Sequence, residues 1–331
     1  MIRRYAALLL RALVTTLTAV IGGACVCQSA AAQLPDRPIR IIIPYVAGGP
    51  ADVIARSLAQ RITAKGGPSF VVENKTGGGG VIAAQATRQS APDGTTLFLT
   101  DLPTFGINPN LLADFPLDPV RDFKPLTLLF TFPSLLVVPV NLEAKSVAEL
   151  VTLARNTPGG IAYGSQGQGS GGQLLAEMWG KAAGVSLVHV PYRGSAQAYP
   201  DLVSGRVSFM FGSYGGAKPF LADGRLRALA VPSRERLKAL PDIPTLAELG
   251  YQDMELELWY GLVAPAATPD DIITALRALF VAEINAPEMV ERLEQQGINV
   301  VTSTPADFAQ LIKSDLGRLA PIVKSINTQG K

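Results

Sequence analysis

Cysteine and histidine are the residues that this sequence has least of. Its 331 residues include two cysteines, Cys25 and Cys27, both near the amino terminus, and one histidine, His189. A zinc site needs several cysteine or histidine ligands, and a disulfide framework needs paired cysteines along the folded chain. The sequence therefore predicts no metal site, no disulfide framework and no cysteine nucleophile.

Neither sign of charge dominates the chain. Its 29 basic residues face 27 acidic ones, for a formal net charge of +2. Arg3, Arg4 and Arg11 all fall within residues 1–32, which contain no acidic residue, so 26 basic and 27 acidic residues remain beyond them. Nucleic-acid binding relies on a basic excess that neutralises phosphates. We therefore expect no nucleic-acid partner.

Long hydrophobic runs are also missing, although the amino terminus contains a short one. A basic start is followed by an uncharged stretch over residues 12–27 and by small residues at Ala30 and Ala32. This order is typical of a secretory signal peptide. The sequence predicts that residues 1–32 are a cleaved leader, that the mature chain starts at Gln33, and that the protein is periplasmic.

Two other roles for this segment are weighed against cleavage. A permanent membrane anchor would need about 20 consecutive apolar residues. A lipoprotein would carry a small-residue box before its modified cysteine, but Cys25 follows Gly22-Gly23-Ala24 and Cys27 follows Val26. Lipidation stays open as the weaker alternative.

Beyond the leader, short β-branched runs alternate with helical patterns. The predicted strands lie at residues 39–45, 70–73, 95–99, 126–130, 135–138, 161–163, 187–190, 207–211, 226–231 and 258–264. The predicted helices lie at residues 52–64, 147–155, 173–183, 196–204, 269–284, 287–296 and 305–326. Strands that alternate with helices are typical of parallel sheets built from βαβ units. We therefore expect an α/β fold with parallel sheets.

The length beyond the leader predicts two lobes. About 299 residues remain, which is more than one hydrophobic core usually holds. We expect a first lobe over residues 33–132, a second lobe over residues 133–250 and a return to the first lobe over residues 251–331. The Pro133-Ser134 step between two predicted strands is a candidate hinge.

A glycine-containing loop follows the first predicted strand. Its residues are Val46, Ala47, Gly48, Gly49, Pro50 and, at the start of the next helix, Asp52. Glycines let a backbone approach a ligand closely, and the N–H groups at a helix start attract anions. The structural alternative is that the glycines close a tight turn and that Asp52 caps the helix. The loop is therefore a candidate anion site.

A second glycine-rich loop lies between the strand at 161–163 and the helix at 173–183. Gly167, Gly169 and Gly172 match G-x-G-x-x-G, the pattern of a dinucleotide-binding turn. The acidic residue that this motif expects after the next strand is absent, although Arg193 could hold a 2′-phosphate. An NADP-dependent oxidoreductase that uses the Gly167–Gly172 loop therefore stays open as the alternative function.

The inventory of catalytic residues is nearly empty. His189 lies inside an apolar strand, where a packed and hydrogen-bonded ring is expected rather than a general base. No serine occupies a G-x-S-x-G motif and no lysine completes a phosphate-binding Walker loop. Asp52 and Asp201 are each interpreted as residues at a helix start. We therefore expect no enzyme activity, no catalytic residues and no cofactor.

Several motifs in a fixed order carry a resemblance to a known family. They are Pro35 to Tyr45 (PDRPIRIIIPY), Ala47 to Arg56 (AGGPADVIAR), Val71 to Lys75 (VVENK), Ala91 to Gly94 (APDG), Ile107 to Pro109 (INP), Tyr163 to Ser165 (YGS), His189 to Gly194 (HVPYRG), Leu240 to Thr245 (LPDIPT) and Trp259 to Leu262 (WYGL). From the mature start to about Trp259, the chain resembles the substrate-binding proteins of tripartite tricarboxylate transporters, the Bug family.

This resemblance implies a type II periplasmic-binding-protein fold, in which two βα lobes are joined by two crossing strands with the ligand cleft between them. It implies an extracytoplasmic solute-binding protein, monomeric, that captures a small carboxylate-containing solute for the membrane components of such a transporter. The carboxylate would be held by loop backbone and ordered water. The implied ligand-binding residues are Val46, Ala47, Gly48, Gly49, Pro50, Asp52, Thr104, Ser165, Gly167, Ser170, Tyr192, Arg193, Gly194 and Asp201.

The sequence departs from the family pattern at two places that bear on the ligand. Gln173 stands where the family often has histidine, so the second-lobe pocket could accept a different ligand. Asp101 precedes Thr104 in an unusual segment, and its carboxylate could favour a ligand with an amine. The simpler expectation is that Asp101 faces water.

Overall fold

The computed structural model describes residues 34–327, and from Leu34 onward they belong to one compact unit. The predicted leader, with its cleavage site, Cys25 and Cys27, lies outside the described residues. Within the described range, no helix is both long enough and apolar enough to cross a membrane.

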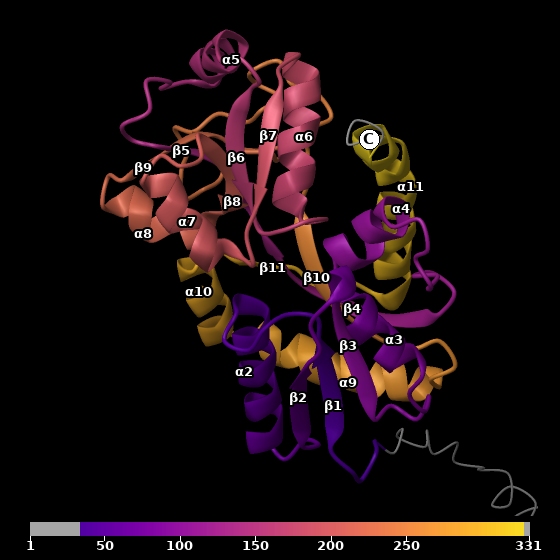
Figure 1. Cartoon of the computed structure of the whole chain (residues 1–331). Coiled ribbons are helices and arrows are strands. Elements are labelled where there is room, and N and C mark those ends of the chain that lie inside the picture. Colours follow the sequence, from indigo (N-terminus) through magenta and orange to yellow (C-terminus); the bar gives the residue numbers. More distant parts are fainter. Residues whose placement is uncertain (1–33, 328–331) are drawn as a thin grey trace, which may run out of the picture. The chain divides into compact units, whose positions relative to one another are not determined.

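Six strands form the first sheet, sheet A, in the order β11-β4-β10-β3-β1-β2 (Figure 1). Their bounds are β1 Ile39–Ile43, β2 Phe70–Asn74, β3 Thr96–Asp101, β4 Phe123–Phe132, β10 Leu258–Pro265 and β11 Asn299–Val300. Strands β1, β2 and β3 are parallel, whereas β10 runs antiparallel to both β3 and β4. Sheet A is therefore the core of the first lobe, and its strands come from both ends of the chain.

Five strands form the second sheet, sheet B, in the order β7-β6-β8-β5-β9. Their bounds are β5 Ser134–Pro139, β6 Ile161–Ser165, β7 Leu187–Pro191, β8 Phe209–Ser213 and β9 Leu226–Ala230. Strand β6 is parallel to β7 and β8, whereas β5 is antiparallel to β8 and β9. The parallel strands that the βα rhythm predicted are therefore present in both sheets, and the strands that connect the lobes, β5 and β10, run antiparallel to their neighbours.

The chain passes between the sheets at two places. Strand β4 ends at Phe132 in sheet A and β5 begins at Ser134 in sheet B, so Pro133 alone separates them. The return runs through β10, which starts at Leu258. The predicted lobe boundaries at residues 132/133 and 250/251, and the hinge at Pro133-Ser134, stay predictions.

Helices cover both sheets. Those of the first lobe are α2 Pro50–Ala64, α3 Val81–Arg88, α4 Asn108–Leu111, α9 Asp270–Ile284, α10 Pro287–Gln295 and α11 Pro305–Asn327. Those of the second lobe are α5 Val147–Asn156, α6 Gly171–Ala183, α7 Ser195–Val203 and α8 Tyr214–Ala222. The sequence did not predict α3, α4 or α8, which are all short, and α4 and α8 contain proline.

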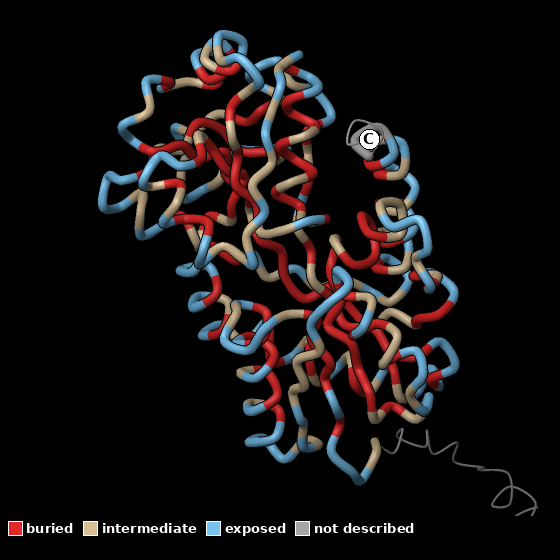
Figure 2. Tube along the Cα trace, viewed as in Figure 1, coloured by how far each residue is buried: buried red, intermediate tan, exposed pale blue. Residues whose placement is uncertain are grey.

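Apolar side chains fill the space between helices and strands, and the strands are the most deeply buried part of the chain (Figure 2). Ile41, Leu99 and Leu262 on sheet A pack against α2 and α9. Trp179 on α6 meets Phe209 of β8 edge to face, with ring centroids 5.2 Å apart. These cores hold the strands rigidly, so the loops at the strand ends have fixed starting points.

Candidate functional site

The candidate site residues lie at the carboxyl ends of strands in both sheets. Strands β1 and β3 end at Ile43 and Asp101, and β6 and β7 end at Ser165 and Pro191. In α/β sheets this edge is where ligands bind, because helix starts with unpaired N–H groups follow it. Figure 1 shows the labelled strands from which these loops emerge.

Asp52 sets the course of the loop after β1. Its carboxylate accepts the Gly48 N–H at 2.9 Å, the Asn74 amide at 2.9 Å and the Arg56 guanidinium at 3.0 Å. Although burial opposes ionisation, the bonds from Arg56, Gly48 and Asn74 hold the Asp52 pKa below its usual value. Asp52 is the third residue of α2, and Gly49 is the N-cap. Asp52 is therefore not the helix cap that the structural alternative expected. It holds the loop by hydrogen bonds from inside the helix.

This loop presents unpaired backbone N–H groups. Val46, Ala47 and Gly48 are exposed, and Pro50 stands at the first helical position, as the sequence predicted. Among the described residues, the N–H groups of Ala47 and Gly49 have no hydrogen-bond acceptor, whereas that of Gly48 is taken by Asp52. The start of α2 can therefore offer donors to an anion.

Asp101, at the end of β3, is fully buried, so the expectation that it faces water is wrong. The Tyr45 hydroxyl donates to its carboxylate, and the Thr104 N–H donates to it at 2.8 Å. Burial raises the Asp101 pKa despite these two hydrogen bonds. Thr104 lies in a π-helical turn over Pro103–Ile107 and not in an open loop, and it is 1% exposed.

The loop after β6 closes on its own side chains. Ser170 is the N-cap of α6 and accepts the Gln173 N–H at 3.3 Å, while Gln173 accepts the Gly169 N–H at 2.8 Å. The first two residues of α6, Gly171 and Gly172, have N–H groups at the helix start, where no intrahelical acceptor exists. Both glycines are buried in this structure, so the start of α6 does not present these donors at the surface, and Ser170 and Gln173 shape the loop.

Ser165 and His189 form a hydrogen-bonded pair beneath this loop. Ser165 Oγ lies 2.7 Å from His189 Nε2 and accepts the Gly167 N–H at 3.1 Å. The His189 ring stacks on Tyr163 with centroids 4.9 Å apart, and burial lowers the His189 pKa. Ser165 is fully buried, so its hydroxyl is not exposed to a ligand and instead holds the Gly167 N–H.

The loop after β7 combines a fixed tyrosine with a free cation. The Tyr192 hydroxyl donates to Asp201 at 2.9 Å, and Asp201 also accepts Arg206 at 3.2 Å. Asp201 is the seventh residue of α7 and so does not start the helix, which corrects that expectation. Arg193 is exposed, and its guanidinium makes no ion pair with a described residue. Gly194 is the N-cap of α7.

Asn108 lies where loops of the two lobes meet, and the sequence did not single it out as a site residue. Its side-chain amide donates to the Gly79 carbonyl at 2.6 Å. A Cβ at Gly169 of the second lobe would overlap its side-chain oxygen. The only sequence signal for Asn108 was its place in the Ile107-Asn108-Pro109 motif.

The lobes also meet on α8 and the end of α10. The Lys218 ammonium donates to the Gln295 carbonyl at 2.5 Å, and a Cβ at Gly297 would overlap the Tyr214 ring. These contacts tie the second lobe to the carboxyl-terminal part of the first lobe.

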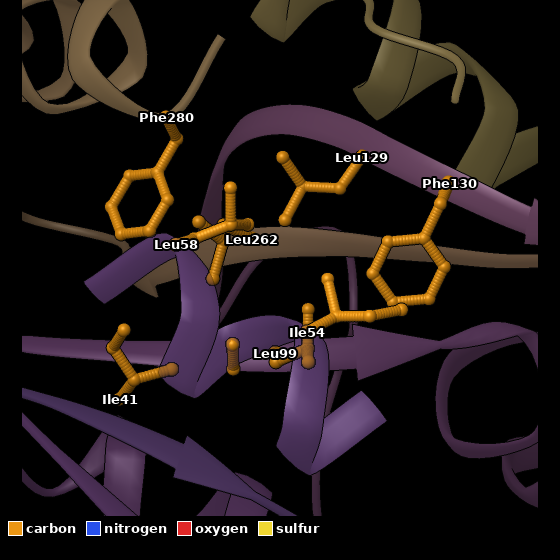
Figure 3. A pocket seen from close by; sticks show the side chains of 9 residues that line it. Ile41, Ile54, Leu58, Leu99, Leu129, Phe130, Leu262 and Phe280 are labelled. Atoms are coloured by element: carbon orange, nitrogen blue, oxygen red, sulfur yellow. The ribbon is translucent and has the colours of Figure 1, made fainter. Parts of the chain in front are cut away.

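A small void in the first-lobe core does not belong to this site. Apolar side chains line it, including Leu58, Leu99 and Phe280 (Figure 3). It offers no polar group to orient a solute. Within residues 34–327 no cluster of three or more histidine, cysteine or acidic side chains could hold a metal ion.

Related sequences cover nearly the whole chain. The profile of the family described as "Tripartite tricarboxylate transporter family receptor" matches residues 54–328. The UPF0065 protein in the tcbD-tcbE intergenic region of Pseudomonas sp. (strain P51) is 35% identical over 290 residues, 87% of this chain and 86% of that protein. Protein BugT of Bordetella pertussis is 32% identical over 298 residues, 90% of this chain and 91% of that protein.

Solved structures agree with this relationship. R. palustris Rpa4515 with adipate has a TM-score of 0.81 at 31% identity, covering 89% of this chain and 98% of that one. The periplasmic binding protein BugD has a TM-score of 0.79 at 30% identity, covering 88% and 98%. MatC (Rpa3494) from Rhodopseudomonas palustris with bound malate has a TM-score of 0.79 at 29% identity, covering 88% and 100%.

These relatives confirm the resemblance that the sequence motifs carried, and with it the two-lobed binding-protein fold. They give no support to the alternative of an NADP-dependent oxidoreductase. The chain belongs to the tripartite tricarboxylate transporter receptor family, as a substrate-binding protein of the Bug type.

Proposed function

We propose that the protein binds a small carboxylate between its two lobes. The observation that carries this proposal is the pair of N–H groups of Ala47 and Gly49 before α2, which have no acceptor among the described residues. The start of α6 would contribute from the second lobe only if its buried Gly171 and Gly172 became accessible on ligand binding. Helix starts favour anions through their N–H groups and the helix dipole. Relatives solved with adipate and with malate support a carboxylate as the ligand class.

The fourteen residues implied by the resemblance take different parts in this proposal. Val46, Ala47, Gly49, Pro50, Arg193 and Gly194 are accessible and would face the ligand. The other eight residues have polar groups that are already hydrogen-bonded within the protein, so they would hold the loops in place: Gly48, Asp52, Thr104, Ser165, Gly167, Ser170, Tyr192 and Asp201. Arg193 supplies a positive charge that could pair with the ligand carboxylate.

The proposed role is capture without chemistry. The described residues hold one histidine, and its ring nitrogen pairs with a buried serine that no ligand could reach without rearrangement. We further propose that the protein is exported to the periplasm by the leader over residues 1–32, works as a monomer and delivers its ligand to membrane components of a tripartite tricarboxylate-type transporter.

A thermal-shift screen of the purified mature protein tests this proposal. A ligand that binds the folded state raises the melting temperature by mass action. Mono-, di- and tricarboxylic acids and acidic amino acids should include at least one stabilising compound, recovered chemically unchanged. The proposal fails if no carboxylate stabilises the protein, or if mass spectrometry shows that the compound has been converted.

A further inference from the structure

Helix α8 of the second lobe lies against the carboxyl end of α10 of the first lobe (Figure 1). The Lys218 ammonium donates to the Gln295 carbonyl at 2.5 Å. A Cβ at Gly215 would overlap the Gln296 carbonyl oxygen. The two helices therefore meet backbone to backbone at Gly215, where no space remains for a methyl group.

Backbone hydrogen bonds hold both sides of this contact. Gln296 is the C-cap of α10, and its N–H donates to the Leu293 carbonyl at 3.0 Å. On the other side, the Tyr214 N–H at the start of α8 donates to the carbonyl of Pro133, the residue between β4 and β5, at 2.9 Å. Packed segments of this kind transmit a displacement because they cannot absorb it locally. Added bulk at Gly215 would therefore move one lobe relative to the other.

The order of the strands places this contact on the opposite side of the crossing strands from the candidate ligand loops. In sheet A, α10 leads into β11, which pairs with β4 on the side away from β10, β3 and β1. In sheet B, α8 packs on β8, β5 and β9, and β9 lies on the side of β5 away from β6 and β7. The candidate ligand loops follow β1, β3, β6 and β7. The crossing strands β4, β5 and β10 thus stand between the two regions.

We propose that the contact of α8 with α10 is a stop that limits how far the lobes open. A rotation about the crossing strands that brings the ligand loops together moves α8 and α10 apart, whereas the opposite rotation presses them together. Since Gly215 already touches the Gln296 carbonyl, further opening is opposed there. The contact therefore acts on ligand affinity without touching the ligand. This inference rests on the proposed function, in which the ligand closes the lobes.

Gly215→Ala should raise ligand affinity, although it introduces an overlap. Gly215 lies within α8 and has no positive φ, so alanine fits its backbone. The added methyl group should shift the lobes toward the closed arrangement, and a larger population of the binding-competent arrangement binds more tightly. By calorimetry, whichever of adipate and malate the wild type binds should bind the variant about threefold to tenfold more tightly.

Gly317→Ala is the matched control. Gly317 lies within α11, has no positive φ, and a Cβ there would meet no atom within 4 Å. The control therefore reproduces the gain in helix propensity that alanine brings to α8, without the overlap. It should leave ligand affinity within about twofold of the wild type.

A distance between two spin labels measures lobe opening without any ligand. Val71 on β2 and Val188 on β7 are both exposed, and their strands are the outermost ones on the ligand side of each sheet. The chain from Gln33 onward has no cysteine, so labels attach only at Val71→Cys and Val188→Cys. In the ligand-free protein, Gly215→Ala should shorten the mean distance between the labels, whereas Gly317→Ala should leave it unchanged.

Lys218→Met tests the same geometry without adding bulk. It removes a bond between α8 and α10 that lobe closure would stretch, so it should also shorten the distance between the labels. Lys218 is exposed, so the variant should fold, which thermal unfolding checks. The inference is overturned if folded Gly215→Ala or Lys218→Met lengthens the label distance or leaves it unchanged. Absence of binding by every carboxylate would instead overturn the proposed function, and the label distances would still decide whether the stop exists.

Discussion

Asn108 of the first lobe and Gly169 of the second lie so close together that a Cβ on the glycine would overlap the asparagine oxygen. If the ligand closes the lobes, this contact should stabilise the closed state. Asn108→Ala removes the side-chain oxygen that packs on Gly169, together with the bond that its amide donates to Gly79 within the first lobe, and should then lower ligand affinity about threefold to tenfold. Isothermal titration calorimetry measures the effect.

Asn110→Ala is the matched control for that prediction. Like Asn108, Asn110 donates to backbone carbonyls of the first lobe, those of Gly106 and Leu316, but a Cβ at Gly169 would meet Asn108 and Leu111 and not Asn110. It should reduce thermal stability while leaving affinity within about twofold. Equal losses of affinity in the two variants would show that the contact between lobes plays no part.

Gly49→Val should abolish binding without unfolding the protein. Gly49 has φ −70°, which valine adopts readily, and a Cβ there would meet only the Val46 carbonyl, at 3.5 Å. The valine side chain would instead obstruct approach to the unpaired N–H of Gly49. Solution scattering should show that ligand reduces the radius of gyration of the wild type and not of the variant. A variant that binds and compacts like the wild type would contradict the proposed site.

Asp52→Ala should destabilise the fold as well as weaken binding. The change strands the Gly48, Asn74 and Arg56 donors that the carboxylate now accepts, and a bond to a charged group contributes about 2 kcal/mol. Urea unfolding should show a loss of about that size. Asp223→Ala removes an ion pair with Arg225 whose two side chains are both largely exposed, so it should cost less than about 1 kcal/mol.

The lowered pKa of Asp52 also gives a pH dependence. The unfolded chain binds its proton near pH 4, whereas the folded chain binds it only at lower pH. The stabilisation by Asp52 is therefore present above about pH 4 and is lost as the pH falls through the folded pKa. Asp52→Ala should show a shallower fall in unfolding free energy below about pH 4 than the wild type.

His189 should act on binding through Ser165. His189→Leu removes the partner of Ser165 Oγ, which accepts the Gly167 N–H, so ligand affinity should fall severalfold, and His189→Gln should restore part of it.

His189 should also make the stability of the protein depend on pH. Because burial lowers the His189 pKa, the unfolded state takes up its proton first, and folded-state stability should decrease as pH falls below about 6.5. That decrease should be smaller in His189→Leu. An unchanged pH profile would mean that His189 is not the titrating group.

Much of the fold followed from periodicity. The strands at β1, β6 and β7 and the helices α2, α6 and α9 match their predicted positions closely, because each combines a β-branched or amphipathic run with clear glycine or proline ends. Helix α8 was missed because Gly215, Gly216 and Pro219 have low helix propensity. The helix forms because Tyr214 and Ala217 are buried against sheet B, and this packing compensates for the low propensity. Strand direction depends on the crossings between lobes, which no local pattern encodes.

The sequence predicted which loops form the candidate site, but not the hydrogen bonds that their residues make. Glycine clusters after strands located the loops, yet the roles within them depend on tertiary partners: Asp52 with Asn74, Asp101 with Tyr45, and Ser165 with His189. Each pair joins residues more than twenty positions apart. Sequence alone therefore left Asp101 facing water and gave Asp201 the wrong place in its helix.

Calorimetry of the wild-type protein with a carboxylic acid and with the corresponding neutral amide tests the central claim most directly. The acid should be the one that raises the melting temperature most, and the amide preserves its shape without the charge. If helix-start N–H groups and Arg193 hold the carboxylate, the acid should bind at least tenfold more tightly than the amide. Equal affinities for acid and amide would contradict carboxylate capture by these loops.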